Sequence, residues 1–193
     1  MNSRLRFRSI CLFTALAGFV LTTGCTTAPR TSEERAQLIS NAEATIAKAR
    51  QADPDFAKFL DSAAGFVVFP KVAKGAAGVG GAYGKGVLFL RGRAVGFTTM
   101  TQATVGAQLG GQGYAEIIAF ETPEAVKNFE RGNFTFAAQA SAVALKSGAT
   151  KNAKYTDGVA VFSFDETGLM AEASIGGQKF DYQPNDEVKD QGK

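Results

Sequence analysis

The sequence of 193 residues contains no histidine and no tryptophan, and it has only two cysteines. Without histidine the chain cannot form a Ser-His-Asp triad, a cysteine–imidazole pair or a histidine metal site. Two cysteines are too few for the disulfide framework that stabilises many small secreted domains. These absences exclude most hydrolase and metalloenzyme mechanisms, and phenylalanine, present 16 times, must supply most of the aromatic core.

The N-terminal segment has the pattern of a secretory signal. Three arginines within residues 4–8 precede an apolar run from Ile10 to Leu21, which is shorter than the ~20 residues of a transmembrane helix. The next residues, Leu21-Thr-Thr-Gly-Cys25, resemble the lipobox of bacterial lipoproteins, with the leucine one position further from the cysteine than usual. We therefore expect residues 1–24 to be removed and Cys25 to carry palmitate-type acyl chains. The alternative is a secreted protein cut elsewhere, with Cys25 a spare thiol.

Removal of residues 1–24 also removes the excess of positive charge. The whole chain has 21 Lys and Arg against 18 Asp and Glu, and the removed segment holds three arginines and no acidic residue. The mature chain therefore has 18 residues of each sign. This balance gives no support to a nucleic-acid partner, which would require an excess of basic residues.

Two helices are predicted after a short polar tether, residues 25–31. Thr31-x-x-Glu34 has the spacing of a capping box, and an apolar stripe at helical spacing continues to about Gln51. Asp53-Pro54 opens a second helix, since proline suits the first helical position, and this helix should end near Gly65.

From Phe66 onward, short apolar runs separated by glycine are typical of strands. One further helix, opened by Thr122-Pro123, should end at Gly132. The predicted strands are 66–69, 73–84, 87–90, 94–99, 101–109, 114–120, 134–143, 159–164, 169–175 and 179–182. The pattern predicts an α+β fold: a curled antiparallel sheet or partial β-barrel with the N-terminal helices packed on one side. It forms a single domain, residues 32–183, followed by a polar tail, residues 184–193.

The glycine-rich segment from Gly75 to Gly86 does not fit the nucleotide-binding motifs. Tyr83 stands at the third glycine position of a dinucleotide fingerprint, and Gly84-Lys85 lacks the Ser or Thr that follows in a P-loop. The G-x-S-x-G and S-x-x-K motifs of serine enzymes are also absent. We therefore expect no enzymatic activity, no cofactor and no metal, and we interpret the glycines as positions of close packing and bending in strands.

The charge pattern contains one marked asymmetry, because no Asp or Glu occurs from Ser62 to Ala115. The same stretch contains five basic residues, Lys71, Lys74, Lys85, Arg91 and Arg93. If their side chains share a face, they form a site for anionic lipid head groups. The alternation of side chains along strands would instead distribute them over both faces. We take these five as candidate lipid-binding residues and leave both arrangements open.

Two blocks of the chain resemble the SYLF-domain family of lipid-binding proteins: residues 65–71, GFVVFPK, and residues 74–87, KGAAGVGGAYGKGV. Further similar segments follow in the order of the family at residues 104–108, 134–141 and 168–177, so that the resemblance covers roughly residues 35–182. Many members carry a Trp-Ser-x-Pro segment where this chain has FTTM, residues 97–100. A partner recognised through that segment is therefore not expected here.

The resemblance implies a non-enzymatic domain that binds membrane phospholipid, with phosphoinositides as ligands of eukaryotic members, some of which also bind actin. For an envelope lipoprotein, recognition of anionic phospholipid in general is the part that carries over. Because Thr26 rather than Asp follows Cys25, we expect a lipid-anchored protein of the outer membrane, facing the periplasm or exposed at the surface. The alternative is an envelope scaffold that binds another protein and has no lipid-specific site.

Overall fold

The computed structural model describes residues 29, 31–77, 79–105, 110–132, 135–137, 142–144, 150, 153–164 and 177–185. The expected signal peptide, Cys25, the strand predicted at 169–175 and the tail from residue 186 lie outside these residues. The described part contains helices α1 (Ser32–Ala52), α2 (Pro54–Ser62) and α3 (Pro123–Glu130). Its strands are β1 (Gly65–Ala77), β2 (Val79–Leu90), β3 (Arg93–Val105), β4 (Gly110–Phe120), β5 (Thr135–Ala137), β6 (Ala142–Ala144), β7 (Val159–Phe164) and β8 (Gly177–Pro184).

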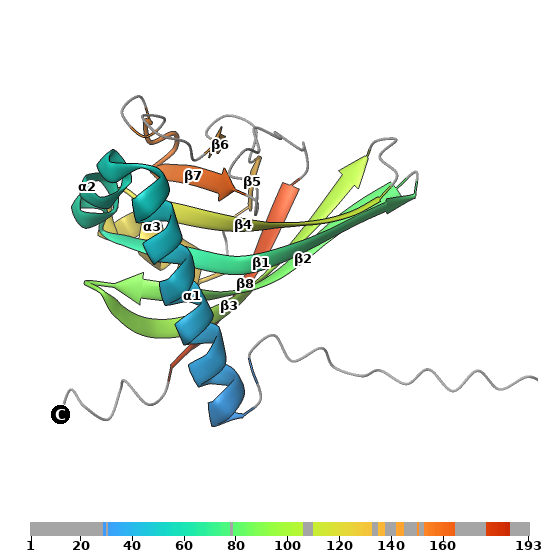
Figure 1. The fold of residues 1–193 in the computed structure, drawn as a ribbon, viewed down its shortest axis with the longest axis horizontal. Coiled ribbons are helices and arrows are strands. Elements are labelled where there is room, and N and C mark those ends of the chain that lie inside the picture. The colour runs from blue at the N-terminus through green and yellow to red at the C-terminus, as the bar shows by residue number, and fades with distance from the viewer. Residues whose placement is uncertain are drawn as a thin grey trace, which may run out of the picture.

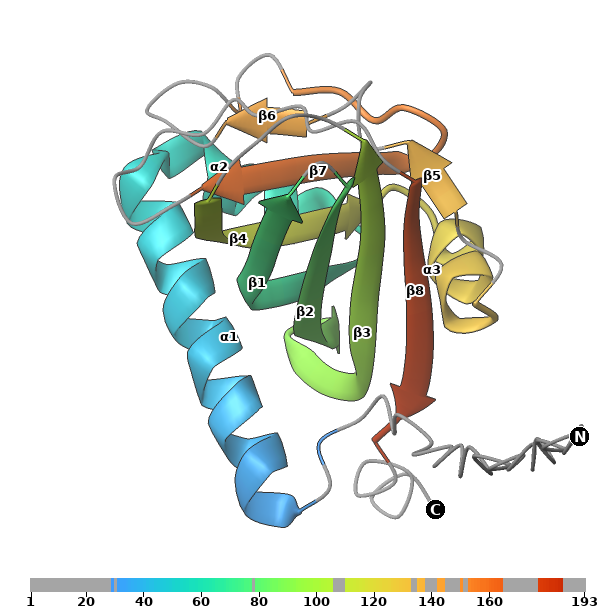
Figure 2. The ribbon, with the colours of Figure 1, turned by 90° about the vertical axis from the view of Figure 1, so that its right-hand side faces the viewer.

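The strands form one sheet in the order β5-β8-β3-β2-β1-β4-β7-β6. All neighbouring strands are antiparallel except β6 and β7, which are parallel. The sheet curls strongly (Figures 1 and 2), so that the Gln178 side chain on β8 reaches Glu116 on β4 although three strands separate them. The predicted α+β class and curled sheet are confirmed, and the parallel pair at one edge is the exception to the antiparallel expectation.

The two faces of the sheet have separate apolar cores. On the outer face, α1 and α2 pack against buried side chains such as Val68, Phe89 and Phe162. On the inner face, which the curl encloses, α3 contributes Phe129, whose ring centroid lies 5.3 Å from that of Phe180. Figure 2 shows α1 and α3 on different sides of the strands. The N-terminal helices therefore pack on one side, as predicted, and α3 packs on the other.

The helices start at the residues that the capping patterns predict. The Thr31 hydroxyl accepts a hydrogen bond from the Glu34 amide at 3.1 Å, and the Thr122 hydroxyl accepts one from the Ala125 amide at 3.2 Å. The end of α2 differs from the prediction: the helix ends at Ser62, and Gly65 is already the first residue of β1.

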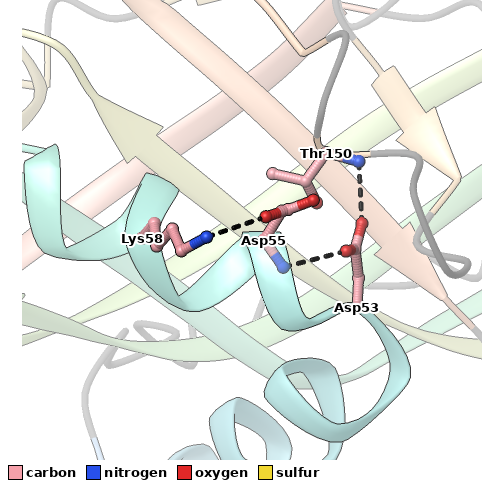
Figure 3. A network of polar contacts seen from close by, with 4 residues as sticks. All are labelled: Asp53, Asp55, Lys58 and Thr150. Carbon is pink, nitrogen blue, oxygen red and sulfur yellow. Dashed lines mark hydrogen bonds and ion pairs between the residues drawn. The ribbon is translucent and has the colours of Figure 1, made fainter.

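Asp53 joins the start of α2 to a distant segment of the chain (Figure 3). Its side chain is fully buried and accepts hydrogen bonds from the Asp55 amide at 3.1 Å and the Thr150 amide at 2.8 Å. The same Asp55 forms an exposed ion pair with Lys58 on the next turn of the helix. One carboxylate thus both caps α2 and holds residue 150 against it.

Several predicted strand boundaries are wrong. The segment 66–69 and the first part of 73–84 form one strand, β1, because a register shift between Val68 and Lys71 accommodates Pro70. Residues 79–84 belong to β2, and the strands predicted at 94–99 and 101–109 are the single strand β3. The strand predicted over 134–143 is replaced by β5 and β6, at opposite edges of the sheet.

Candidate functional site

The outer face of the sheet is covered by α1 over part of its length. The helix crosses the near side of the sheet in Figure 1, while β1, β2 and β3 extend beyond it. Under the helix the outer-facing residues are apolar and buried, including Val87, Phe89 and Phe97. Beyond it they are lysines, threonines and small residues, with Tyr83 45% exposed. This uncovered surface is the candidate site.

Two of the expected lysines face each other at the centre of this surface. Lys71 on β1 and Lys85 on β2 are direct cross-strand partners, which places their Cβ atoms about 5 Å apart. Among the described residues, neither forms an ion pair with a carboxylate. Like charges directly opposite each other destabilise a sheet by roughly 0.2–1 kcal/mol. Sheet stability therefore does not explain why two lysines occupy these opposed positions.

A third lysine joins this surface from the end of the chain. Lys179 on β8 lies opposite Thr101 on β3, and Thr101 lies opposite Tyr83 on β2. In the neighbouring row, Asp181 on β8 lies opposite Thr99, and Thr99 lies opposite Lys85. Lys179 and Asp181 approach to 3.9 Å and are both well exposed. We call Lys71, Tyr83, Lys85 and Lys179 the lysine face. Lys179 was not predicted from the sequence, because no local pattern indicates that β8 pairs with β3.

The start of α1 lies beside the lysine face. The Arg35 guanidinium lies 5.6 Å from the ring centroid of Phe97, and Arg35 Nε donates to the Pro29 carbonyl at 3.4 Å. Phe97 is two residues from Thr99 on β3, on the same outer face, and Thr99 is the partner of Lys85. The chain therefore enters the domain next to the lysine face.

The five basic residues taken from the sequence do not share one face. Lys74 projects to the inner face and is only 8% exposed. Arg91 and Arg93 lie at the β2–β3 turn, roughly 20 Å along the strand from Lys85. Of the five, the structure brings Lys71 and Lys85 together, and strand alternation and the turn separate the other three.

A buried polar cluster of Gln102, Glu116 and Gln178 lies on the inner face, and it was not predicted from the sequence. Gln178 Nε2 lies 3.1 and 3.2 Å from the two carboxylate oxygens of Glu116 and 3.3 Å from Gln102 Oε1. All three residues are at most 5% exposed. Burial raises the pKa of Glu116 to about 7, although the hydrogen bond from Gln178 acts in the opposite direction.

The described residues contain neither a cluster of metal ligands nor a helix suited to cross a membrane. In those ranges no three His, Cys, Asp or Glu side chains are close enough together to hold a metal ion. None of the helices in the described part of the chain is long and apolar enough to cross a membrane. What the arrangement does provide is an exposed cationic surface with one aromatic side chain, which suits an anionic ligand.

Comparison with known proteins agrees with the resemblance noted in the sequence. The chain is 31% identical over 84 residues to the beta cell expansion factor A of Aeromonas veronii, which is 44% of this chain and 32% of that protein. It thus spans about a third of that relative. Residues 101–188 match the Ysc84 family model, described as Las17-binding protein actin regulator; the glycine-rich block at 65–87 lies outside this range. Residues 101–188 are therefore similar to the Ysc84, or SYLF-domain, family.

Proposed function

We propose that this protein is a non-enzymatic envelope lipoprotein, anchored through Cys25 to the outer membrane, whose lysine face binds anionic phospholipid. The observation that carries the proposal is the direct opposition of Lys71 and Lys85 on the uncovered outer face. An anionic head group between the two ammonium groups relieves their repulsion and forms hydrogen bonds with both.

The position of the tether supports the same assignment. Arg35 lies beside Phe97, next to the row that contains Lys85, and its Nε donates to the Pro29 carbonyl. The few residues between Cys25 and Pro29 span at most about 15 Å when extended. An acylated Cys25 would therefore hold the lysine face close to the bilayer surface, where each basic residue contributes about 1 kcal/mol to binding.

The expected anchor is tested by mass spectrometry of the mature N-terminus. We expect an N-terminal Cys25 carrying several acyl chains, because a single chain gives only marginal membrane attachment. A Cys25→Ala variant, which has no acceptor thiol, should be released from the membrane fraction. An unmodified N-terminus at another residue would contradict the anchor, while leaving open whether the domain itself binds lipid.

The lipid site is tested on a chain of residues 25–193 carrying Cys25→Ala, so that neither the acyl groups nor the signal peptide contributes to binding. We expect it to cosediment with vesicles containing phosphatidylglycerol and not with vesicles of phosphatidylcholine alone. Binding should weaken as salt is raised, because the screening length is only about 8 Å at physiological ionic strength. Capture of a protein partner without any vesicle binding would favour the scaffold alternative instead.

A further inference from the structure

The hydrogen bond between Gln178 and Glu116 joins two strands that are distant in the sheet. β8 and β4 are separated by β3, β2 and β1, so this contact crosses the interior of the curl. It lies near the start of β8, since Gly177 is the first residue of that strand. Two residues later, Phe180 packs between Phe69 and Phe129. The first residues of β8 are therefore held across the interior by a polar contact, and the following ones by an apolar contact.

The polar groups of this contact do not form all the hydrogen bonds that they could. One amide group, Gln178 Nε2, lies within 3.3 Å of three oxygen atoms, while the Gln178 Oε1 atom is buried with no hydrogen-bond partner. An ionised Glu116 would thus be a buried carboxylate stabilised by a single amide. Burying a charge under such conditions is costly, so ionisation favours any rearrangement that admits water.

Among the described residues, no ion pair joins Glu116 to a lysine or arginine. Its partners in register are Phe69 on β1 and Ser163 on β7, and Gln178 reaches it from β8. Lys74 on β1 and Tyr114 on β4 also project to the inner face, but neither lies opposite Glu116. Because the chain has no histidine, no imidazole contributes to titration near neutral pH.

We propose that the Gln178–Glu116 contact is a proton-controlled tie that sets how tightly β8 closes against β4. With Glu116 neutral, the start of β8 is held across the interior. With Glu116 ionised, residues 177–179 separate from β4, their backbone pairing with β3 and β5 opens, and water reaches the carboxylate. Phe180 stays packed and limits the opening to this end of the strand. No lipid is involved in the tie itself, so the inference goes beyond the proposed function.

The tie would also affect the lysine face. Lys179 follows Gln178 on β8 and projects to the opposite face. Release of residues 177–179 therefore moves Lys179 relative to Lys71 and Lys85. This consequence, unlike the tie, rests on the proposed lipid site.

The test is backbone amide exchange of residues 177–179 in the lipid-free protein at pH 5 to 8, expressed as protection factors that correct for the intrinsic rate. The buried carboxyl has a pKa of about 7 and an unperturbed one has 4.5. Opening should therefore increase with pH between these values and level off above pH 7, so that protection falls on the order of 50-fold from pH 5 to 8. Glu116→Gln, which keeps an acceptor but cannot ionise, should remove this dependence. Asp181→Asn, an exposed carboxyl on the same strand, should not.

Two further measurements keep the test independent of how well one variant folds. In the wild type, carbon-13 NMR should show one glutamate carboxyl that titrates near pH 7 and is absent from Glu116→Gln. Gln178→Asn, whose shorter side chain cannot span the interior, should show low protection already at pH 5. Protection that is independent of pH in the wild type, or an unchanged pH dependence in Glu116→Gln, would overturn the proposal.

Discussion

At the scale of single residues, Glu116 is a carboxyl group in an environment far from its ordinary one. It is 3% exposed, and its folded-state pKa is raised from 4.5 to about 7 by burial. The folded state therefore binds a proton more tightly than the unfolded state does. Its contribution to stability is fully present below pH 4.5 and is lost as the pH rises through 7.

This sign gives a prediction for global unfolding. Relative to Glu116→Gln, the free energy of unfolding of the wild type should fall by about 3 kcal/mol between pH 4.5 and 8, since one pKa unit corresponds to about 1.4 kcal/mol. Urea denaturation of both proteins at the two pH values measures the difference. A stability difference that stays constant with pH would show that Glu116 has similar pKa values in the folded and unfolded states.

Two strand glycines differ in what surrounds them. A Cβ atom on Gly86 would lie 2.7 Å from the Phe69 ring and 2.9 Å from the Val68 carbonyl, whereas one on Gly75 would meet nothing within 4 Å. Gly86→Ala should therefore destabilise the protein by about 1–3 kcal/mol through overpacking. Gly75→Ala should be neutral or slightly stabilising. Thermal denaturation compares them, and equal effects would contradict this account of Gly86.

At the scale of elements, the helix starts followed local rules and the strand ends did not. Thr31, Asp53 and Thr122 cap the helices as their sequence patterns predict, because a cap depends on residues two or three positions apart. A strand was predicted to end at Phe69, but the register shift beside Pro70 lets β1 continue. A bulge depends on the partner strand, which local periodicity does not contain.

The Asp53 contact provides a test at this scale. Asp53→Ala removes the cap of α2, worth about 1 kcal/mol, and leaves the buried Thr150 amide without its acceptor, worth about 1–3 kcal/mol. We expect a loss of about 2–4 kcal/mol in denaturant unfolding, with faster exchange at the Thr150 amide. The control is Asp61→Ala, which breaks only the exposed ion pair with Arg50 and should cost less than about 1 kcal/mol. Similar losses in both variants would contradict this role for Asp53.

At the scale of the whole molecule, the lysine face is assembled from segments that are about 100 residues apart. The acid-free stretch directed attention to Lys71 and Lys85, and these two do lie together. Lys74 lies on the opposite face because it is three positions after Lys71, and an odd offset along a strand changes the face. Lys179 could not be found from local sequence, since its position depends on the pairing of β8 with β3. Which residues share a surface thus depends more on how the strands pair than on runs of like charge in the sequence.

The central claim is that anionic lipid binds the lysine face, and two double variants of equal charge change test it most directly. Lys71→Glu/Lys85→Glu alters the lysine face, whereas Arg91→Glu/Arg93→Glu alters the β2–β3 turn. Both are made in the chain of residues 25–193 carrying Cys25→Ala and cosedimented with phosphatidylglycerol vesicles. Losing two lysine contacts should weaken binding by at least about 30-fold, from about 1 kcal/mol each, while the arginine variant keeps most of its affinity. Equal losses in the two variants, or no loss in either, would contradict the assignment of this face as the lipid site.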